Sequence, residues 1–245
     1  PEHTVWLLCA PSPEDMIATI RSRCRHLGLR IPTASAVADL LVREGVATPE
    51  VALEAARAAQ SHIGLARALA RDPQMRERRR AIITAPASVR SVGEAVMAAD
   101  RLLETAKAQA DAQVSERNAR EKAELMRQLG MDEGESATKA SRTMLRQLEE
   151  DQKRRSKRAL TDAIDRALID LLAIYRDVLM VQVGGDGELI NTDLSDLVHE
   201  IAQDSTPRQT LARVDHIETA RKRLVANGNP LLVLEDMAIS LRPQA

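Results

Sequence analysis

The sequence predicts a mostly all-α fold with a remnant of an α/β domain at its N-terminal end. Aromatic residues make up 1% of the 245 residues, with one Trp, one Tyr and no Phe. β-Strands favour aromatic and β-branched residues, whereas Ala, Leu, Arg and Glu, in which this chain is rich, favour helices. Hydrophobic residues reach 44%, which is enough to build a sizeable core.

Composition also excludes several classes of protein. The formal net charge is −1, so the chain has no overall basic field that would attract nucleic acid. Two cysteines, Cys9 and Cys24, are too few for a disulfide framework and favour a reducing, cytoplasmic compartment. No apolar run approaches the roughly 20 residues that span a bilayer, so we expect no membrane contact. Because the chain starts at Pro1 without Met, we expect a fragment or a trimmed chain.

One segment departs from the helical pattern. Residues 4–10, TVWLLCA, form a continuous apolar run that stops at Pro11-Ser12-Pro13, which predicts a buried strand. A buried strand needs neighbours, and nothing else in the chain reads as a sheet. We therefore expect the remnant of an α/β domain whose other strands are missing, followed by a short helix over residues 15–21.

A compact group of short helices is predicted next. Gly45 ends the first helix, and Thr48-Pro49-Glu50 starts the second with a hydroxyl cap, a proline and an acid in the first turn. Asp72-Pro73 separates the third from the fourth, and Ala85-Pro86-Ala87-Ser88 predicts a domain boundary. The four helices are expected at residues 33–44, 49–59, 62–71 and 74–83.

Two long helices dominate the rest of the chain, over about residues 88–129 and 132–183. The second carries an apolar stripe at three- and four-residue spacing, formed by Leu160, Ile164, Leu168, Leu171, Leu172, Tyr175 and Leu179. Three shorter helices follow at residues 193–203, 207–226 and 230–241. The charged, alanine-rich region 101–158 suits either an extended helical hairpin or a partly frayed, exposed helix.

The chemically pointed motif of the chain is the basic cluster Arg21-Ser22-Arg23-Cys24-Arg25. It follows the predicted strand and short helix, so an arginine there would project from the end of a sheet domain towards a neighbouring subunit. A planar guanidinium held at a γ-phosphate stabilises the charge that develops during hydrolysis. The alternative is a solvated basic surface, and the cluster alone favours that alternative.

The context of this cluster resembles a known family. The stretch VWLLCAPSPEDMIATIRSRCRHLGLRIP resembles the sensor-1 strand, following helix and Ser-Arg-Cys motif of AAA+ clamp-loader subunits. Residues 32–83 look like their helical lid, and the tail HIETARKRLVANGNPLLVLEDMAISL looks like the closing helices of their collar. The resemblance is greatest to the delta-prime subunit of bacterial DNA polymerase III in its high-GC, actinobacterial form. It implies an AAA+ core remnant at 1–31, a lid at 32–85 and an α-helical collar, or oligomerisation domain, at 86–245.

The resemblance implies a non-motor subunit that helps to load the sliding clamp onto primed DNA during DNA replication. It maps a trans-acting arginine finger onto Arg23, with Ser22 and Cys24 as its motif neighbours. This chain would bind no cofactor or metal itself, because ATP and Mg²⁺ would be held by partner subunits. The implied partners are delta and gamma/tau type subunits, joined through the collar. The chain would not be catalytic alone. It would belong to the DNA-directed DNA polymerase holoenzyme, which is a nucleotidyltransferase (transferase) complex. That complex is part of the cytoplasmic, nucleoid-associated replisome.

Departures from the motor subunits of that family agree with this interpretation. The chain has no G-x-x-x-x-G-K-[ST] phosphate loop and no acidic strand for Mg²⁺, and both would lie upstream of Pro1. The zinc-binding cysteine module of the family would also lie upstream, so we expect no metal here. Ser12 is the one hydroxyl beside the sensor-1 position. Gly64 stands where motor subunits carry a sensor-2 arginine, and Arg67 is a possible substitute.

Three alternative functions stay open. An ATP-hydrolysing motor subunit of the same loader would need a phosphate loop upstream of Pro1. A helical DNA-binding regulator would use residues 33–83 as a helix-turn-helix. A coiled-coil interaction protein is opposed by the weak heptad regularity of residues 88–183.

Other residues are weaker candidates for a metal, catalytic or phosphate-binding site. Cys24 and His26, even with Cys9 and His3, lack the ligand spacing of a zinc site, and no third group orients a Cys-His nucleophile. Two basic runs could contact phosphate, although neither is interleaved with aromatic residues and acidic neighbours favour a salt-bridged face for the second. These runs are Arg76, Arg78, Arg79 and Arg80, and Lys153, Arg154, Arg155, Lys157 and Arg158. Collar assembly is expected to use the apolar side chains of Leu211, Val214, Ile217, Leu224, Leu234, Met237 and Leu241.

Overall fold

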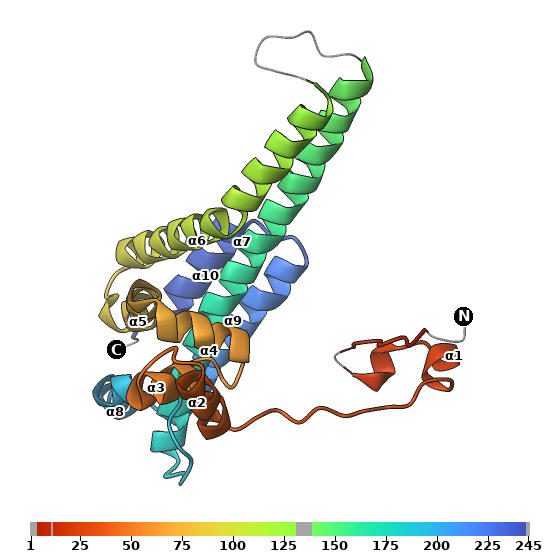
Figure 1. Cartoon of the computed structure of the whole chain (residues 1–245). Helices are drawn as coiled ribbons and strands as arrows, with labels where there is room; N and C mark the ends of the chain where they lie inside the picture. The colour runs from red at the N-terminus through yellow and green to blue at the C-terminus, as the bar shows by residue number, and fades with distance from the viewer. Residues whose placement is uncertain (1–3, 11, 131–138, 244–245) are drawn as a thin grey trace. The chain divides into compact units, whose positions relative to one another are not determined.

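The computed structural model of the chain describes residues 4–10, 12–130 and 139–243, and these residues are mostly helical, without a β-strand. The chain divides into two compact units, residues 1–33 and residues 34–245 (Figure 1). None of the helices in the described ranges combines the length and the apolar character needed to cross a bilayer.

The first unit contains little regular structure. Residues 4–10 have no hydrogen-bonded secondary structure and are exposed, so the prediction of a buried strand is wrong for this chain. The physical reason is that a strand needs a partner, and the described residues contain no other strand. The short helix expected over 15–21 is divided into a 3₁₀ turn, Pro13–Asp15, and the four-residue helix α1, Ala18–Arg21. Extended backbone at Met16 ends the first of them.

The second unit begins with a bundle of three short helices, α2 (Ala34–Arg43), α3 (Pro49–Ala58) and α4 (Ile63–Arg71), close to the predicted bounds. Gly45 ends the α2 turn in the left-handed conformation, at φ +66°, as glycine readily does. The bundle packs around Val37, Leu41 and Leu69 and eight buried alanines. Alanine side chains let the helix backbones approach closely, so this core needs few large residues.

Helix α5 (Pro73–Ser88) joins the short helices to the long ones. It continues beyond Ile83 and through Pro86, so the boundary predicted at residues 85–88 lies inside a helix. Pro86 is in the last turn, where it removes one backbone hydrogen bond without ending the helix. The N-terminal half of α5 contributes Met75 to the three-helix core, whereas Ile82 and Ile83 belong to the core of the long helices.

The long helices α6 (Val92–Gln128) and α7 (Lys139–Gln182) pack against each other, and α6 ends before Gly130, at φ +63°. Three shorter helices complete the bundle: α8 (Ser195–Gln203), preceded by the 3₁₀ turn η2 (Thr192–Leu194), α9 (Pro207–Val225) and α10 (Pro230–Leu241). Figure 1 shows the α6–α7 hairpin extending beyond the ends of α9 and α10. The start of the second long helix was predicted near Asp132, which lies outside the described residues.

The core of this bundle is centred on α7. The apolar stripe predicted for that helix is confirmed, with Ile164, Leu168 and Leu171 fully buried and Leu160 and Leu172 packed beside them. The prediction that a set of apolar side chains of α9 and α10 is available for collar assembly is wrong for most of that set. Ile217, Leu234, Met237 and Leu241 are buried in this chain's own core, and Val214 and Leu224 pack against it, because α9 and α10 turn these faces towards α6 and α7. Of that set, Leu211 is exposed.

Polar contacts fix α9 against α7. Tyr175, the chain's one tyrosine, is buried, which raises its pKa to about 12, and the Arg213 guanidinium lies 5.8 Å from its ring centroid in a cation–π contact. At the end of α7, Gln182 donates to the Ser205 carbonyl oxygen at 2.7 Å and accepts from the Thr210 hydroxyl at 2.9 Å. The start of α9 is therefore held at the C-terminal end of α7.

Candidate functional site

The Arg21–Arg25 motif lies at the C-terminal end of α1 and in the turn that follows. The Ser22 backbone N–H donates to the Ala18 carbonyl, and the Ser22 hydroxyl donates to the Thr19 carbonyl oxygen at 3.3 Å. Arg23 Nη1 donates to the same Thr19 oxygen at 2.8 Å. The last carbonyls of a helix lack intrahelical partners. The side chains of Ser22 and Arg23 therefore supply hydrogen bonds to a carbonyl oxygen at the end of α1.

The cations of this motif are not neutralised within the described residues. Arg21, Arg23 and Arg25 form no ion pair there, and Ser22, Arg23 and Cys24 are all exposed. The acidic Glu14 has its pKa lowered mainly by a hydrogen bond from the Ser12 hydroxyl and by its backbone, with smaller contributions from the charge of Arg21 and His26. An exposed guanidinium without a carboxylate partner can offer its planar set of donors to phosphate oxygens.

The sulfur and imidazole groups near the motif are not brought together as a site. Cys9 and Cys24 are exposed free thiols, and a His26 ring nitrogen contacts the Arg21 carbonyl oxygen at 3.0 Å. Within the described ranges no group of three or more His, Cys, Asp or Glu side chains could hold a metal ion. His3 lies outside the described residues.

The residues predicted beside the family's sensor positions have structural partners. Ser12 caps the 3₁₀ turn, where its side chain accepts from the Glu14 N–H and its backbone donates to Asp15. Gly64 is in the first turn of α4. Arg67 makes a two-point contact with Glu44 through Nε at 3.0 Å and Nη2 at 2.9 Å. Arg67 therefore ties α4 to the end of α2.

The first basic run binds the chain itself rather than presenting a phosphate surface. Arg76 Nη1 donates to the Leu69 and Ala70 carbonyls at the end of α4, at 2.6 and 3.2 Å. Arg78 pairs with Asp72 at 3.2 Å, and Arg80 lies 3.8 Å from Asp193. Arg79 also has intramolecular acceptors, so every arginine of the run is bound within the chain. Arginines that are bound within the chain are less available to DNA phosphates, which disfavours the helix-turn-helix alternative.

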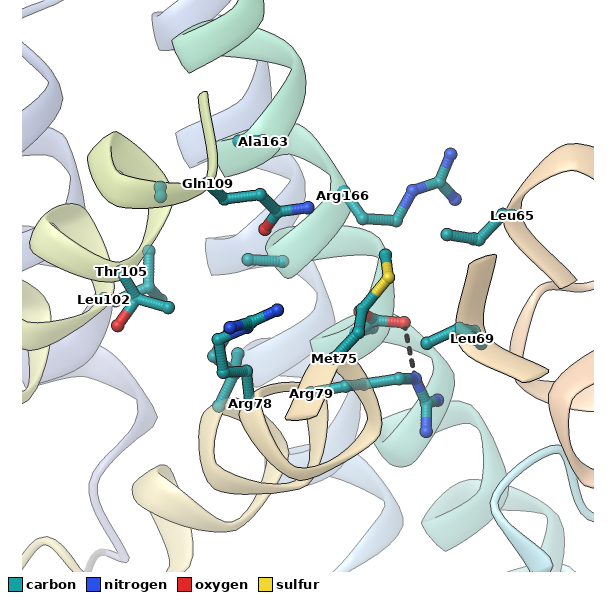
Figure 2. Close-up of a pocket in the computed structure, with 14 residues that line it drawn as sticks. Leu65, Leu69, Met75, Arg78, Arg79, Leu102, Thr105, Gln109, Ala163 and Arg166 are labelled. Carbon is teal, nitrogen blue, oxygen red and sulfur yellow. Dashed lines mark hydrogen bonds and ion pairs between the residues drawn. The ribbon is translucent and has the colours of Figure 1, made fainter. Parts of the chain in front are cut away.

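Arg79 is buried, with 9% of its side chain exposed, and sequence reasoning missed this role. Its Nε donates to Asp170 Oδ1 on α7 at 3.0 Å (Figure 2), and its Nη2 donates to Asn191 Oδ1 at 2.5 Å. Burial raises the pKa of Asp170 by more than the Arg79 charge lowers it. One signal was available: Arg79 precedes the buried Ile83 by four residues, which places both on one face of the helix.

A small cavity lies between α4, α5, α6 and α7, with Arg79 and Asp170 on its wall (Figure 2). Its volume is about 30 Å³, which is room for a single water molecule rather than for a nucleotide. Apolar side chains such as Leu65, Leu69 and Leu102 line much of the remainder. This cavity is a packing gap beside the Arg79 ion pair.

The second basic run lies on the outward part of the α6–α7 hairpin. Arg154 pairs with Asp151, as the acidic neighbours of the run predicted. Arg155 crosses to α6, where it contacts Asn118 at 2.7 Å and Glu121 at 2.8 Å. Lys157 donates to Asn227 in the α9–α10 turn at 3.0 Å. Within this run, Arg155 joins the two helices of the hairpin and Lys157 joins α7 to the α9–α10 turn.

Comparison with known proteins gives one informative similarity. No protein-family model matches the chain, and no solved structure matches it. Over 72 residues, 29% of this chain, the sequence is 35% identical to the DNA polymerase III subunit delta' of Bacillus subtilis (strain 168). The matched part is 22% of that protein, so the chain spans about a fifth of the length of its curated relative. The similarity supports a relationship with this replication subunit, in agreement with the family that the motif resembles.

Proposed function

We propose that this chain is a non-motor, delta-prime-type subunit of a bacterial clamp loader, helping to load the sliding clamp onto primed DNA. The observation that carries the proposal is the similarity to a DNA polymerase III subunit delta', supported by the exposed Ser22-Arg23-Cys24 motif. In this proposal residues 1–31 belong to an AAA+ core. Among the described residues, Val5, Trp6 and Leu7 of this segment are exposed, which suits a surface covered by other protein in such a core.

Arg23 is the arginine finger in this proposal. Its guanidinium is exposed and has no carboxylate partner in the described residues, and its one hydrogen bond goes to a backbone carbonyl. That contact is neutral, so a phosphate group could displace it and gain a charged interaction. ATP and Mg²⁺ would be bound by an adjacent gamma/tau-type subunit, and Arg23 would stabilise the charge that develops on the γ-phosphate.

The helical parts serve as lid and collar in the proposed assembly. Residues 32–85, with α2–α4 and most of α5, are the lid, and residues 86–245, with α6–α10, are the collar that joins neighbouring subunits. Since the apolar faces of α9 and α10 are buried in the chain's own core, contacts with neighbours fall to side chains left outside it. Val225 at 79% exposure and Leu232 at 63% flank the α9–α10 turn and are the strongest candidates.

The test replaces Arg23 by Ala in the subunit and reconstitutes the loader with its partners, the sliding clamp and primed DNA. We expect the complex to assemble normally while the DNA- and clamp-stimulated ATPase rate falls. Arg25→Ala is the matched control, because it removes a charge from the same cluster outside the Ser-Arg-Cys motif. Arg23→Lys should fail to restore the rate, since an ammonium lacks the planar fork of donors. Unchanged ATPase and clamp loading with Arg23→Ala would refute the assignment.

A further inference from the structure

The outer part of the α6–α7 hairpin continues a face on which another helix already packs further in. On α7, Ile164 and Leu168 are buried in the core that this helix shares with α9. Counting outwards from Ile164 in steps of four and three residues gives Leu160, Lys157 and Lys153. Residues at this spacing lie on one side of a helix, so the face that receives α9 extends outwards to the two lysines.

The α9–α10 pair ends at the inner edge of this extension. Lys157 Nζ donates at 3.0 Å to Oδ1 of Asn227, which is in the turn between α9 and α10. Figure 1 shows the hairpin continuing beyond the ends of both helices. A helix placed on the extended face would therefore follow α9 along the hairpin and lengthen the bundle.

A groove of about 630 Å³ lies on the extended face. In the part of the chain that the structure describes, its lining comes from α6 and α7 alone, so no third helix covers it. Ala110 and Leu160 line the groove and belong to a small apolar cluster with Val114 and Ala159. The aliphatic stems of lysines also cover apolar surface while their ammonium groups stay in water. The groove thus offers an apolar floor between charged walls.

The charged side chains of the groove are mainly basic. They are four cations and two carboxylates: Lys107, Lys153, Arg154, Lys157, Asp111 and Glu150. Lys107, Arg154 and Glu150 form ion pairs with neighbours on their own helices. Within the described residues the other three form no ion pair, which leaves two lysines on the α7 wall and the Asp111 carboxylate on the α6 wall.

This pattern selects a kind of partner. Lys153 and Lys157 are exposed and lie one helical turn apart. Carboxylates three or four residues apart on a facing helix would meet both lysines, while its apolar side chains would lie on Ala110 and Leu160. A helix that brings cations to the α7 wall would be repelled, because like charges brought together oppose binding.

We propose that this groove binds an amphipathic helix of a neighbouring loader subunit, with carboxylates facing Lys153 and Lys157 and apolar side chains on Ala110 and Leu160. The inference rests on the proposed function and adds to it a contact of stated chemistry beside the α9–α10 turn. Charge pairing sets the orientation of the bound helix, and apolar burial supplies the larger part of its affinity.

The test measures association of the full subunit with delta and gamma/tau type partners. Lys153→Glu/Lys157→Glu reverses both unpaired charges of the α7 wall and should weaken association at least about tenfold at low ionic strength, with a smaller effect as salt is added. Ser156→Trp fills the groove without a change of charge, since Ser156 lines it, and should weaken association at every salt concentration. Circular dichroism verifies that both variants stay helical.

Arg127→Glu/Arg158→Glu is the matched control and should associate as the parent does. It makes the same change of charge at two exposed arginines of the hairpin that lie outside the groove lining. Carbodiimide coupling joins a lysine amine to a carboxylate in contact with it, and therefore identifies the occupant. The expected products link Lys153 or Lys157 to Asp or Glu side chains of a partner subunit's helix.

Each other outcome has a distinct meaning. Parental affinity in folded Lys153→Glu/Lys157→Glu or Ser156→Trp would overturn the groove inference and leave the proposed function standing. Coupling to a second copy of this chain, or weaker binding of primed DNA with unchanged subunit association, would assign the groove to a different partner and also overturn it. A parent that associates with no loader subunit would refute the proposed function, and this inference with it.

Discussion

Asp177→Ala should destabilise this protein more than any other single carboxylate replacement in the loop region. The carboxylate is fully buried and is the acceptor for two backbone N–H groups and for the Asn191 amide. Without it, these donors lose their partner in a place that water reaches poorly. A buried donor left unsatisfied costs about 1–3 kcal/mol, so the expected loss is about 3–5 kcal/mol, a large part of a typical domain's stability of about 5–15 kcal/mol.

Urea unfolding followed by far-ultraviolet circular dichroism measures this loss, and hydrogen exchange at Ile190 and Asn191 locates it. Asp186→Ala is the control: Asp186 is in the same loop but exposed, so its replacement should stay within about 0.5 kcal/mol of the parent. In Asp177→Ala, the amides of Ile190 and Asn191 should lose their exchange protection before the amides of the flanking helices do. A loss below about 1 kcal/mol would refute the view that this carboxylate organises the loop.

Two further predictions concern the hairpin and the collar surface. Hydrogen bonds from Arg155 and Arg117 lower the pKa of Glu121 from 4.5 to about 2, so its contribution to holding the hairpin is complete above pH 4.5 and is lost as the pH falls from 4.5 towards 2. The protection factors of α6 amides near Glu121, meaning their exchange rates relative to an unstructured chain at the same pH, should therefore fall over that pH range in the parent but not in Glu121→Gln. Parallel behaviour of the two proteins would contradict this. Leu232→Asp should weaken association with partner subunits, measured by analytical ultracentrifugation, while the monomer stays folded. Leu234→Asp is the control at a buried position and should unfold the monomer. Full association by Leu232→Asp would exclude the surface around Leu232 as a subunit contact.

Helix positions in residues 34–243 could be predicted well because each signal is local. Thr48-Pro49 and Asn229-Pro230 start helices at the expected places, and Gly45 and Gly130 end them. The strand predicted at residues 4–10 is absent, because a strand depends on partners elsewhere and apolar content does not supply them. The continuation of α5 through Pro86 was missed because the proline indicated a helix end, whereas in the last turn it removes one backbone hydrogen bond and the helix continues to Ser88.

Site residues were harder to predict than helices. The sequence identified the Arg21–Arg25 motif and placed its side chains on the surface, but the role proposed for it involves a partner subunit, which the sequence of one chain does not reveal. Arg79 was read as one member of a basic run because residue type alone does not distinguish a solvated arginine from a buried one. Its partner Asn191 is 112 residues away in the chain, so only the helical phase of Arg79 with Ile83 hinted at burial.

The contrast between these arginines bears on where function is located. In the described residues every ion pair lies within 44–236. The long-range ones join separate helices or, for Arg57 and Glu188, a helix and a loop. Arg21, Arg23, Arg25 and Arg30 form none, and no described residue from 4 to 33 is buried. A segment with exposed Trp6, Leu7 and Leu29 beside unpaired cations does not satisfy its own surface, because apolar patches and free guanidinium groups together favour contact with another molecule. The paired arginines thus stabilise the helical scaffold, and the unpaired ones are those available to another molecule.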